Sequence, residues 1–195
     1  MGDLNAIIVK AKSGGEPFSY NGKEQSFDLS EFWSWAQSDL LNNTLRGILA
    51  EFIVKKALSI DSQTRTEWDS FDLMAENELK LEIKSSAYLQ SWKQNNLSHI
   101  SFDIAPTKEW NNDSNNYSSE SKRSSDYYVF CLLHHKEKES VNPLELKQWT
   151  FYVLKTTILD KKKGSQKKIS LSSLLKLDPT VYTYQELHMS KLFRL

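Results

Sequence analysis

The sequence predicts an α/β fold in which a central mixed β-sheet of about four to six strands is flanked by helices. Three observations support this prediction. Helical patterns occupy residues 28–58, strand patterns recur between residues 71 and 159, and helical patterns return from residue 170 onwards. Because 195 residues with 39% hydrophobic and 26% charged side chains are typical of one globular core, we expect a single domain over residues 1–195.

Charge and cysteine content limit the classes of function. Lysine plus arginine number 25 and aspartate plus glutamate also number 25, so any phosphate binding must come from local patches. Cys131 is the single cysteine and cannot form an internal disulfide. No apolar run reaches the length of a membrane span, and the first residues lack a basic segment followed by an apolar one. We therefore expect a cytoplasmic protein without a membrane partner.

A first helix is expected from Asp28 to about Leu41. Asp28 is a good N-cap, and Glu31 stands at the capping-box position three residues later. Trp33 and Trp35 lie on this helix. Tryptophans on a helix are more often packing residues than a platform for stacking bases, so we expect both to pack against the core.

A second helix starts at Asn43 or Thr44 and continues to Leu58, with apolar residues around most of its circumference. At helical spacing Glu51 shares one side with Gly47, so its carboxylate lies among small and apolar residues. A carboxylate is seldom left unpaired in such a place. Two interpretations stay open for its partner: a buried ion pair with Arg46 or Arg65, or a metal ion.

The stretch Trp68–Lys84 predicts a β-hairpin, because apolar residues alternate with polar ones on both sides of the turn Glu76–Glu78. The apolar pattern fixes the register, since a slip by one residue would turn a carboxylate into the core. In this register Ala75 pairs with Leu79, Leu73 with Leu81 and Phe71 with Ile83.

The other face of the same hairpin carries charge. Asp72 lies opposite Glu82, and Lys84 follows on the same side of the strand. Two opposed carboxylates repel each other unless a cation lies between them, and Mg²⁺ is bound by such pairs together with water and phosphate. Lys84 could neutralise part of the charge, or hold or deprotonate a water molecule. The alternative is an ordinary solvated face with cross-strand ion pairs that also involve Lys80.

Three further strands are indicated by apolar runs or alternation at Ile100–Ile104, Tyr127–His135 and Trp149–Leu159. Residues 1–27 predict a short apolar run followed by a loop. Pro106–Asp126 is long, polar and rich in asparagine and serine, so we expect a loop that is either disordered or a flap over a substrate.

After the last predicted strand, a turn is followed by an end of the chain that is expected to be helical from Ser170 onwards. Lys161–Lys163 reads as part of a solvated turn, with a phosphate clamp as the alternative. A short apolar-rich segment spans Ser170–Leu177, and Thr183 with Glu186 predicts a capping box for a last helix that ends near Phe193.

Three segments in this order resemble the PD-(D/E)XK nuclease superfamily. They are the helical segment Arg-Gly-x-Leu-Ala-Glu at Arg46–Glu51, the triplet Phe71–Leu73 around Asp72, and Glu-x-Lys at Glu82–Lys84. The resemblance covers roughly residues 43 to 105, and each member lies on the element that the family uses. The family's proline before the aspartate is Phe71 here, and many members lack that proline.

The resemblance implies an α/β restriction-endonuclease-like fold and a Mg²⁺-dependent active site in which Mn²⁺ can substitute. By position it implies that Asp72, Glu82 and the backbone carbonyl of Ile83 bind the metal. It also implies that Lys84 orients or activates the attacking water, while Glu51 assists metal or water binding.

The same resemblance implies a metal-dependent endonuclease that hydrolyses phosphodiester bonds, with DNA as its nucleic-acid partner. Several relatives carry a polar residue a few positions after the lysine, near the scissile phosphate, which makes Gln90 a nucleic-acid-binding candidate. A homodimer or a larger complex would suit double-strand cleavage. The alternatives are a non-catalytic nucleic-acid-binding or interaction module on the same fold, and a nuclease subunit that cuts only within a larger complex.

Overall fold

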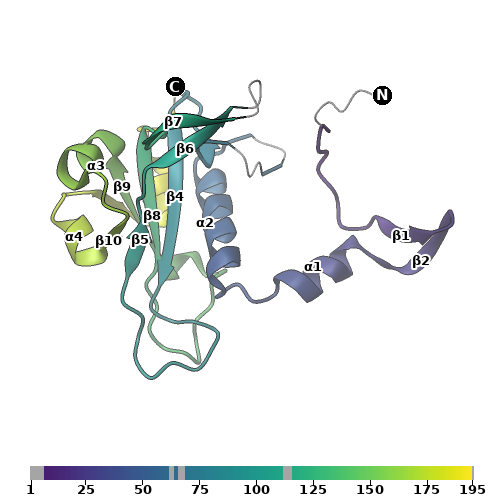
Figure 1. Cartoon of the computed structure of the whole chain (residues 1–195). Coiled ribbons are helices and arrows are strands. Elements are labelled where there is room, and N and C mark those ends of the chain that lie inside the picture. Colours follow the sequence, from purple (N-terminus) through teal and green to yellow (C-terminus); the bar gives the residue numbers. More distant parts are fainter. Residues whose placement is uncertain (1–6, 62–63, 66–68, 112–115, 195) are drawn as a thin grey trace.

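The computed structural model describes residues 7–61, 64–65, 69–111 and 116–194, and its centre is a five-stranded sheet (Figure 1). The strand order is β11-β9-β8-β4-β3, in which β4 and β8 run parallel and the other neighbours run antiparallel. The predicted fold class, α/β with a central mixed sheet flanked by helices, is confirmed. The strands are β3 (Leu73–Met74), β4 (Lys80–Ala87), β8 (Tyr127–Leu133), β9 (Trp149–Lys155) and β11 (Thr180–Tyr182).

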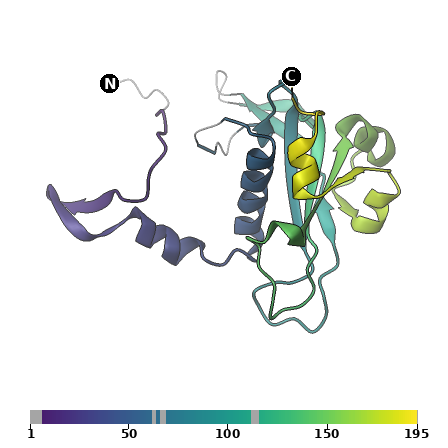
Figure 2. The ribbon, with the colours of Figure 1, turned by 180° about the vertical axis from the view of Figure 1, so that it is seen from behind.

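Each face of the sheet is covered by its own layer and has its own apolar cluster. Helices α2 (Asn43–Ala57) and α5 (Tyr184–Met189) pack side by side on one face, where the yellow ribbon in Figure 2 is α5. The other face is covered by α3 (Thr156–Lys163), α4 (Leu171–Leu175) and the strand pair β5 (Ser101–Asp103) with β10 (Lys168–Ser170). Strand β8 is buried along its whole length because both layers press on it.

The two-residue period of β4 decides which side chains reach which layer. Leu81 and Ile83 belong to the cluster beneath α2, so Glu82 and Lys84 between and after them point to the opposite face. The predicted hairpin register is confirmed, since Leu73 pairs with Leu81 and the Ala75 N–H donates to the Leu79 carbonyl at 2.9 Å. Its first strand is shorter than expected, and the first predicted residue, Trp68, lies outside the described residues.

The caps read from the sequence explain where the helices begin. Asp28 accepts from the Glu31 N–H at the start of α1 (Leu29–Gln37), and Thr183 with Glu186 forms the predicted capping box of α5. Helix α2 begins at Asn43, as predicted, with Asn42 as its N-cap. None of the helices in the described part of the chain is long and apolar enough to cross a membrane.

The N-terminal residues form an arm that projects away from the sheet (Figures 1 and 2). It consists of a hairpin, β1 (Pro17–Tyr20) and β2 (Lys23–Asp28), followed by α1. The hairpin was not predicted, although Asn21-Gly22, both with positive φ, is a strong two-residue turn signal. The packing prediction for Trp35 is wrong, since α1 buries no residue and the Trp35 side chain is 84% exposed.

The segment predicted as a long loop, Pro106–Asp126, instead contains a second hairpin of β6 (Thr107–Asn111) and β7 (Asn116–Lys122). This hairpin has few apolar residues, and its two strands are joined by backbone hydrogen bonds. The buried Arg123 fixes the end of β7, because its guanidinium donates to the Ile104 carbonyl and to Asp160 Oδ1, each at 2.7 Å.

Other predicted boundaries are wrong, among them the end of the last helix, which is Met189 and not near Phe193. Strand β9 ends at Lys155 and α3 follows at once, so Lys161–Lys163 form the last turn of a helix and not a loop. The lysines complement the negative end of the helix dipole there. Strand β11 occupies part of the region expected to be helical, and β10 forms just before that region. A 3-10 turn, η1 (Leu146–Gln148), precedes β9.

We expect the substitution Leu81→Ala to lower the free energy of unfolding by about 2–5 kcal/mol, because Leu81 is fully buried between β4 and α2 and a cavity would remain. Urea denaturation followed by circular dichroism measures this. Met74→Ala on the neighbouring strand is the matched control, since Met74 is 51% exposed and should change stability little. Equal losses in the two variants would contradict the core described here.

Candidate active site

The short strand β3 brings Asp72 to the edge of β4. The Asp72 N–H donates to the Leu81 carbonyl at 2.9 Å, and the Asp72 carboxylate accepts from the Ile83 N–H at 2.6 Å. The Asp72 carboxylate thus accepts a hydrogen bond that a backbone carbonyl would accept if β3 were longer. Since the N–H and C=O groups of one strand residue point toward the same edge, the Ile83 carbonyl faces this edge too.

Glu82 and Lys84 lie on one face of β4 and form an ion pair. The distance from Lys84 Nζ to Glu82 Oε1 is 2.5 Å, and the two side chains are 28% and 20% exposed respectively. The sequence predicted that these residues share a face, and the structure agrees. Their direct pairing matches the alternative in which an ammonium group neutralises the carboxylate.

Glu51 reaches the same region from α2, and its partner is Arg65. The two side chains form two hydrogen bonds, with the Arg65 Nε at 2.5 Å from Oε2 and Nη2 at 3.1 Å from Oε1. Of the two arginines considered from the sequence, Arg65 is therefore the partner. Arg46 turns away and binds other groups.

Electrostatic coupling joins these four groups into one site. Burial raises the pKa of Glu51, Asp72 and Glu82, and the repulsion of the other carboxylates adds to this at Glu51 and Glu82. For Lys84, burial lowers the pKa, but the negative charges of Glu82, Asp72 and Asp103 outweigh it, so the net pKa is raised. The three acids and the amine predicted from the sequence therefore lie near enough for their charges to affect one another's pKa.

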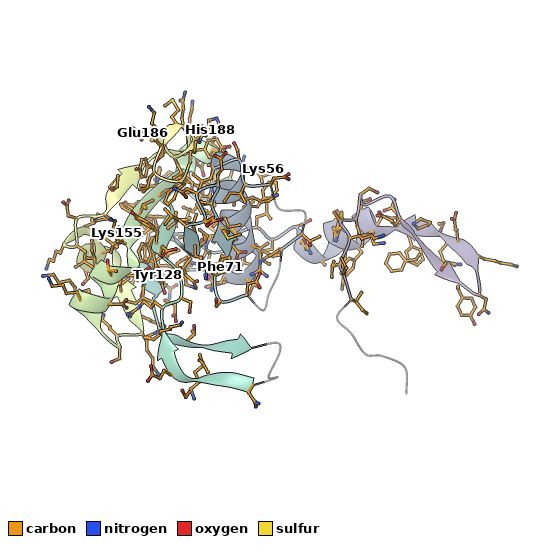
Figure 3. All side chains as sticks on the ribbon, turned by 90° about the horizontal axis from the view of Figure 1, so that it is seen from above. Lys56, Phe71, Tyr128, Lys155, Glu186 and His188 are labelled. Carbon is orange, nitrogen blue, oxygen red and sulfur yellow. The ribbon has the colours of Figure 1, made fainter. Side chains whose placement is uncertain are left out.

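Two nearby residues were missed by sequence reasoning. Tyr128 on β8 stands opposite Glu82 in the parallel register, and burial together with the charge of Glu82 raises its pKa. It lies on the face that α3 and α4 cover (Figure 3). Asp103 on β5 also interacts with Lys84. Neither residue could be predicted from the local sequence pattern, because each reaches the site through contacts between segments that are distant in the chain.

Gln90, predicted to contact nucleic acid, is 6% exposed. Its carbonyl oxygen accepts from Arg46 Nη1 at 3.4 Å, and its amide nitrogen donates to Ser98 Oγ at 3.3 Å and to the Ala87 carbonyl at 3.4 Å. The side chain lines a cavity beside the C-terminal half of β4. Its contact with a substrate remains a prediction.

The comparison with protein families identifies the chain. Residues 26–173, about three quarters of the sequence, match the model of the family described as bacteriophage T4 endonuclease IV.

The chain belongs to the bacteriophage T4 endonuclease IV family. A search among curated proteins returned no significant match. The matched range contains α1, α2, the hairpin of β3 with β4, and all of Glu51, Asp72, Glu82 and Lys84. Most of the N-terminal hairpin lies before it, and α5 lies after it. The candidate site is thus wholly within the part of the chain that defines this endonuclease family.

The candidate site offers oxygen atoms, the kind of ligand that a hard divalent cation prefers. Asp72, Glu82 and the Ile83 carbonyl present oxygen atoms on the β4 edge or beside it, and repulsion between the half-buried carboxylates favours a positive charge. Within the described residues, no three His, Cys, Asp or Glu side chains gather closely enough to hold a metal ion. The reason is visible in the contacts, since Glu51 faces Arg65 and Glu82 faces Lys84.

We expect Asp72→Asn to raise the free energy of unfolding at pH 7.5 in the presence of EDTA. Because burial raises the folded pKa of Asp72 above its usual 3.8, the native state binds more protons than the unfolded state between those two values. The penalty of the ionised carboxylate is therefore present above the raised pKa and is relieved as the pH falls through it. The asparagine oxygen can still accept from the Ile83 N–H.

Urea denaturation between pH 4 and pH 8 measures this difference. The gain in the Asp72→Asn variant should shrink as the pH falls, and Glu76→Gln in the exposed turn should show no such gain. A variant that is less stable than the wild type at pH 7.5 would contradict the pKa direction assigned to Asp72.

Proposed function

We propose that this member of the bacteriophage T4 endonuclease IV family is a Mg²⁺-dependent endonuclease that hydrolyses phosphodiester bonds in DNA through a PD-(D/E)XK active site. The observation that carries the proposal is that β4 holds Asp72 through the Ile83 N–H and carries the Glu82–Lys84 pair, while Glu51 on α2 interacts electrostatically with Asp72 and Lys84. The order of these residues in the chain and the elements that hold them agree with that superfamily. The endonuclease family supports the reaction class.

Asp72, Glu82 and the Ile83 carbonyl would hold the metal, with Glu51 as a further ligand or as a ligand of its water. Mg²⁺ suits these oxygen donors, and Mn²⁺ can replace it. When bound, the ion polarises a phosphate oxygen and neutralises part of its charge. Binding in this way requires Glu82 to turn from Lys84 and Glu51 to turn from Arg65.

The other residues of the chain would position the reactants. Lys84 is a half-buried ammonium group that pairs with Glu82 and feels the charges of Asp72 and Asp103, so it can donate hydrogen bonds to the attacking water or to a phosphate oxygen. Asp72 is fixed by the Ile83 N–H and therefore needs little rearrangement to act. Because a charged phosphate must approach three acids, the two cations Lys84 and Arg65 also reduce the local repulsion.

Assembly into a homodimer is also proposed, with the arm of one copy packed on the second copy. Helix α1 exposes Phe32 and Trp35 beside the acidic Glu31, while α2 exposes Phe52 beneath the amino group of Lys56. Each helix therefore exposes aromatic side chains next to a charged one, acidic on α1 and basic on α2, and such surfaces can pack together in an exchanged arm.

We expect Asp72→Ala and Lys84→Ala each to lower the rate of Mg²⁺-dependent DNA cleavage at least about a hundredfold, because each variant loses a group that acts at the reacting phosphate. Cleavage of a labelled DNA fragment, followed on a gel, measures the rate. Glu76→Ala, in the exposed turn of the same hairpin, should cut like the wild type. Undiminished cleavage in both purified site variants would refute the assignment.

Calorimetric titration with Mg²⁺ or Mn²⁺ separates the enzyme from a non-catalytic module on the same fold. The wild type should bind the ion, and Glu82→Ala should lose most of the signal because a carboxylate ligand is removed. Absence of binding by the wild type, with DNA binding retained, would favour the non-catalytic alternative.

The arm is tested by light scattering coupled to size-exclusion chromatography. Trp35→Ser should shift a dimer toward the monomer, because it removes the most exposed aromatic ring of α1. Leu144→Ser is the matched control, since Leu144 is 64% exposed but lies in the loop before η1. A wild-type protein that is monomeric at all concentrations measured would rule out the exchanged arm.

A further inference from the structure

A polar cavity of about 530 Å³ lies next to the candidate active site. It is bounded by the start of α2, the C-terminal half of β4, and the pair β5 and β10. Its lining is rich in hydrogen-bond donors and carries positive charge, with Arg46, Ser85, Gln90, His99, Ser101 and Lys168 among the residues. Asp103 also lines it and is exposed.

The most unusual member of this lining is Arg46, which is 3% exposed. Its guanidinium donates to Ser85 Oγ at 3.2 Å, to the Leu41 carbonyl at 2.9 Å and to Asn43 Oδ1 at 2.7 Å, besides the longer contact with Gln90. All of these acceptors are neutral. Among the described residues no carboxylate forms an ion pair with Arg46, and burial lowers its pKa to about 10.

Within the described part of the chain, Arg123 is the other buried arginine, and it has the carboxylate partner that Arg46 lacks. Arg123 is 9% exposed and forms an ion pair with Asp160 at 2.7 Å. A buried charge without a counter-charge is costly, so proteins usually pair it or use it. Arg46 keeps its charge beside a cavity open to solvent, which suits a charge whose partner comes from outside the chain.

We propose that this cavity binds a phosphate group of the DNA strand, one nucleotide from the phosphate that is cut, through Arg46, Lys168 and the hydroxyl groups of the lining. The proposal rests on the proposed endonuclease function. Four of the five guanidinium N–H groups of Arg46 already donate within the chain, so Arg46 would act mainly through its positive charge and the remaining N–H. Lys168 and the serine hydroxyls would donate the other hydrogen bonds to the phosphate. The charges of Arg46 and Lys168 exceed the single opposing charge of Asp103.

The position of the cavity along β4 agrees with such a contact. Lys84 is followed directly by Ser85 and Ser86, which line the cavity, and two residues along a strand span about 7 Å. That distance is comparable to the separation of neighbouring phosphates in an extended nucleic-acid strand. A strand whose scissile phosphate lies at Lys84 would therefore bring an adjacent phosphate to the cavity.

Two neighbouring lysines, Lys168 at the start of β10 and Lys167 just before it, provide the test. Lys168 lines the cavity and Lys167 does not, although both are exposed. Binding of a fluorescein-labelled 20-nucleotide DNA, measured by anisotropy in EDTA so that no cleavage occurs, should weaken about threefold to tenfold in Lys168→Gln. The slope of log affinity against log salt should fall by about one, and Lys167→Gln should bind like the wild type. Equal effects of the two substitutions would overturn the proposal.

A scan with single methylphosphonate groups, which remove one backbone charge at a time, locates the phosphate. For the wild type we expect the largest loss of binding at one internal position, and in Lys168→Gln this position should lose most of its effect. Arg46→Gln, if circular dichroism shows that it folds, should behave in the same way. Losses that stay independent of Lys168 at every position would overturn the proposal. A wild type that shows this coupling in EDTA but never cuts DNA would refute the proposed function and leave the phosphate site standing.

Discussion

The hydrogen bond from the Ile83 N–H to the Asp72 carboxylate, 2.6 Å long, is the interaction on which the candidate site depends. Strand β3 has only two residues, so backbone pairing alone would leave the edge of β4 open beyond Leu81. The carboxylate satisfies the next N–H of that edge and is held there by it. An acid that would otherwise extend toward water is thus fixed next to Glu82 and Lys84, because the strand beside it ends early.

Ion pairs stabilise the candidate site, because its carboxylates would repel one another without the neighbouring cations. Three acids share a half-buried space, and their raised pKa values record the free energy that burial costs them. Lys84 and Arg65 offset part of this cost through short ion pairs. A divalent cation would offset it too, and it would compete with these two side chains for the same oxygens. The affinity of the site for a metal ion is therefore a difference between two sets of favourable contacts.

Local patterns predicted the parts of this structure that depend on local physics. The register of the β3–β4 hairpin followed from the two-residue apolar period, and that register alone placed Asp72, Glu82 and Lys84 on one face. The neighbours from distant segments could not be predicted. Tyr128 reaches Glu82 through parallel pairing, and Asp103 reaches the site from a strand in another sheet. The two polar hairpins were missed because they lack an apolar alternation, although the Asn21-Gly22 turn was a legible signal.

A chain without net charge must concentrate its attraction for phosphate at particular places. Lys161–Lys163 and Arg46 are two such places, and salt screens their charges to different degrees. Lys161–Lys163 form the mostly exposed last turn of α3, where water and counter-ions weaken each charge. Arg46 is buried and held by four neutral acceptors, so its charge acts through a less polarisable surrounding and in a fixed direction. One buried guanidinium beside the candidate active site can therefore contribute more to positioning a DNA strand than a cluster of largely exposed lysines.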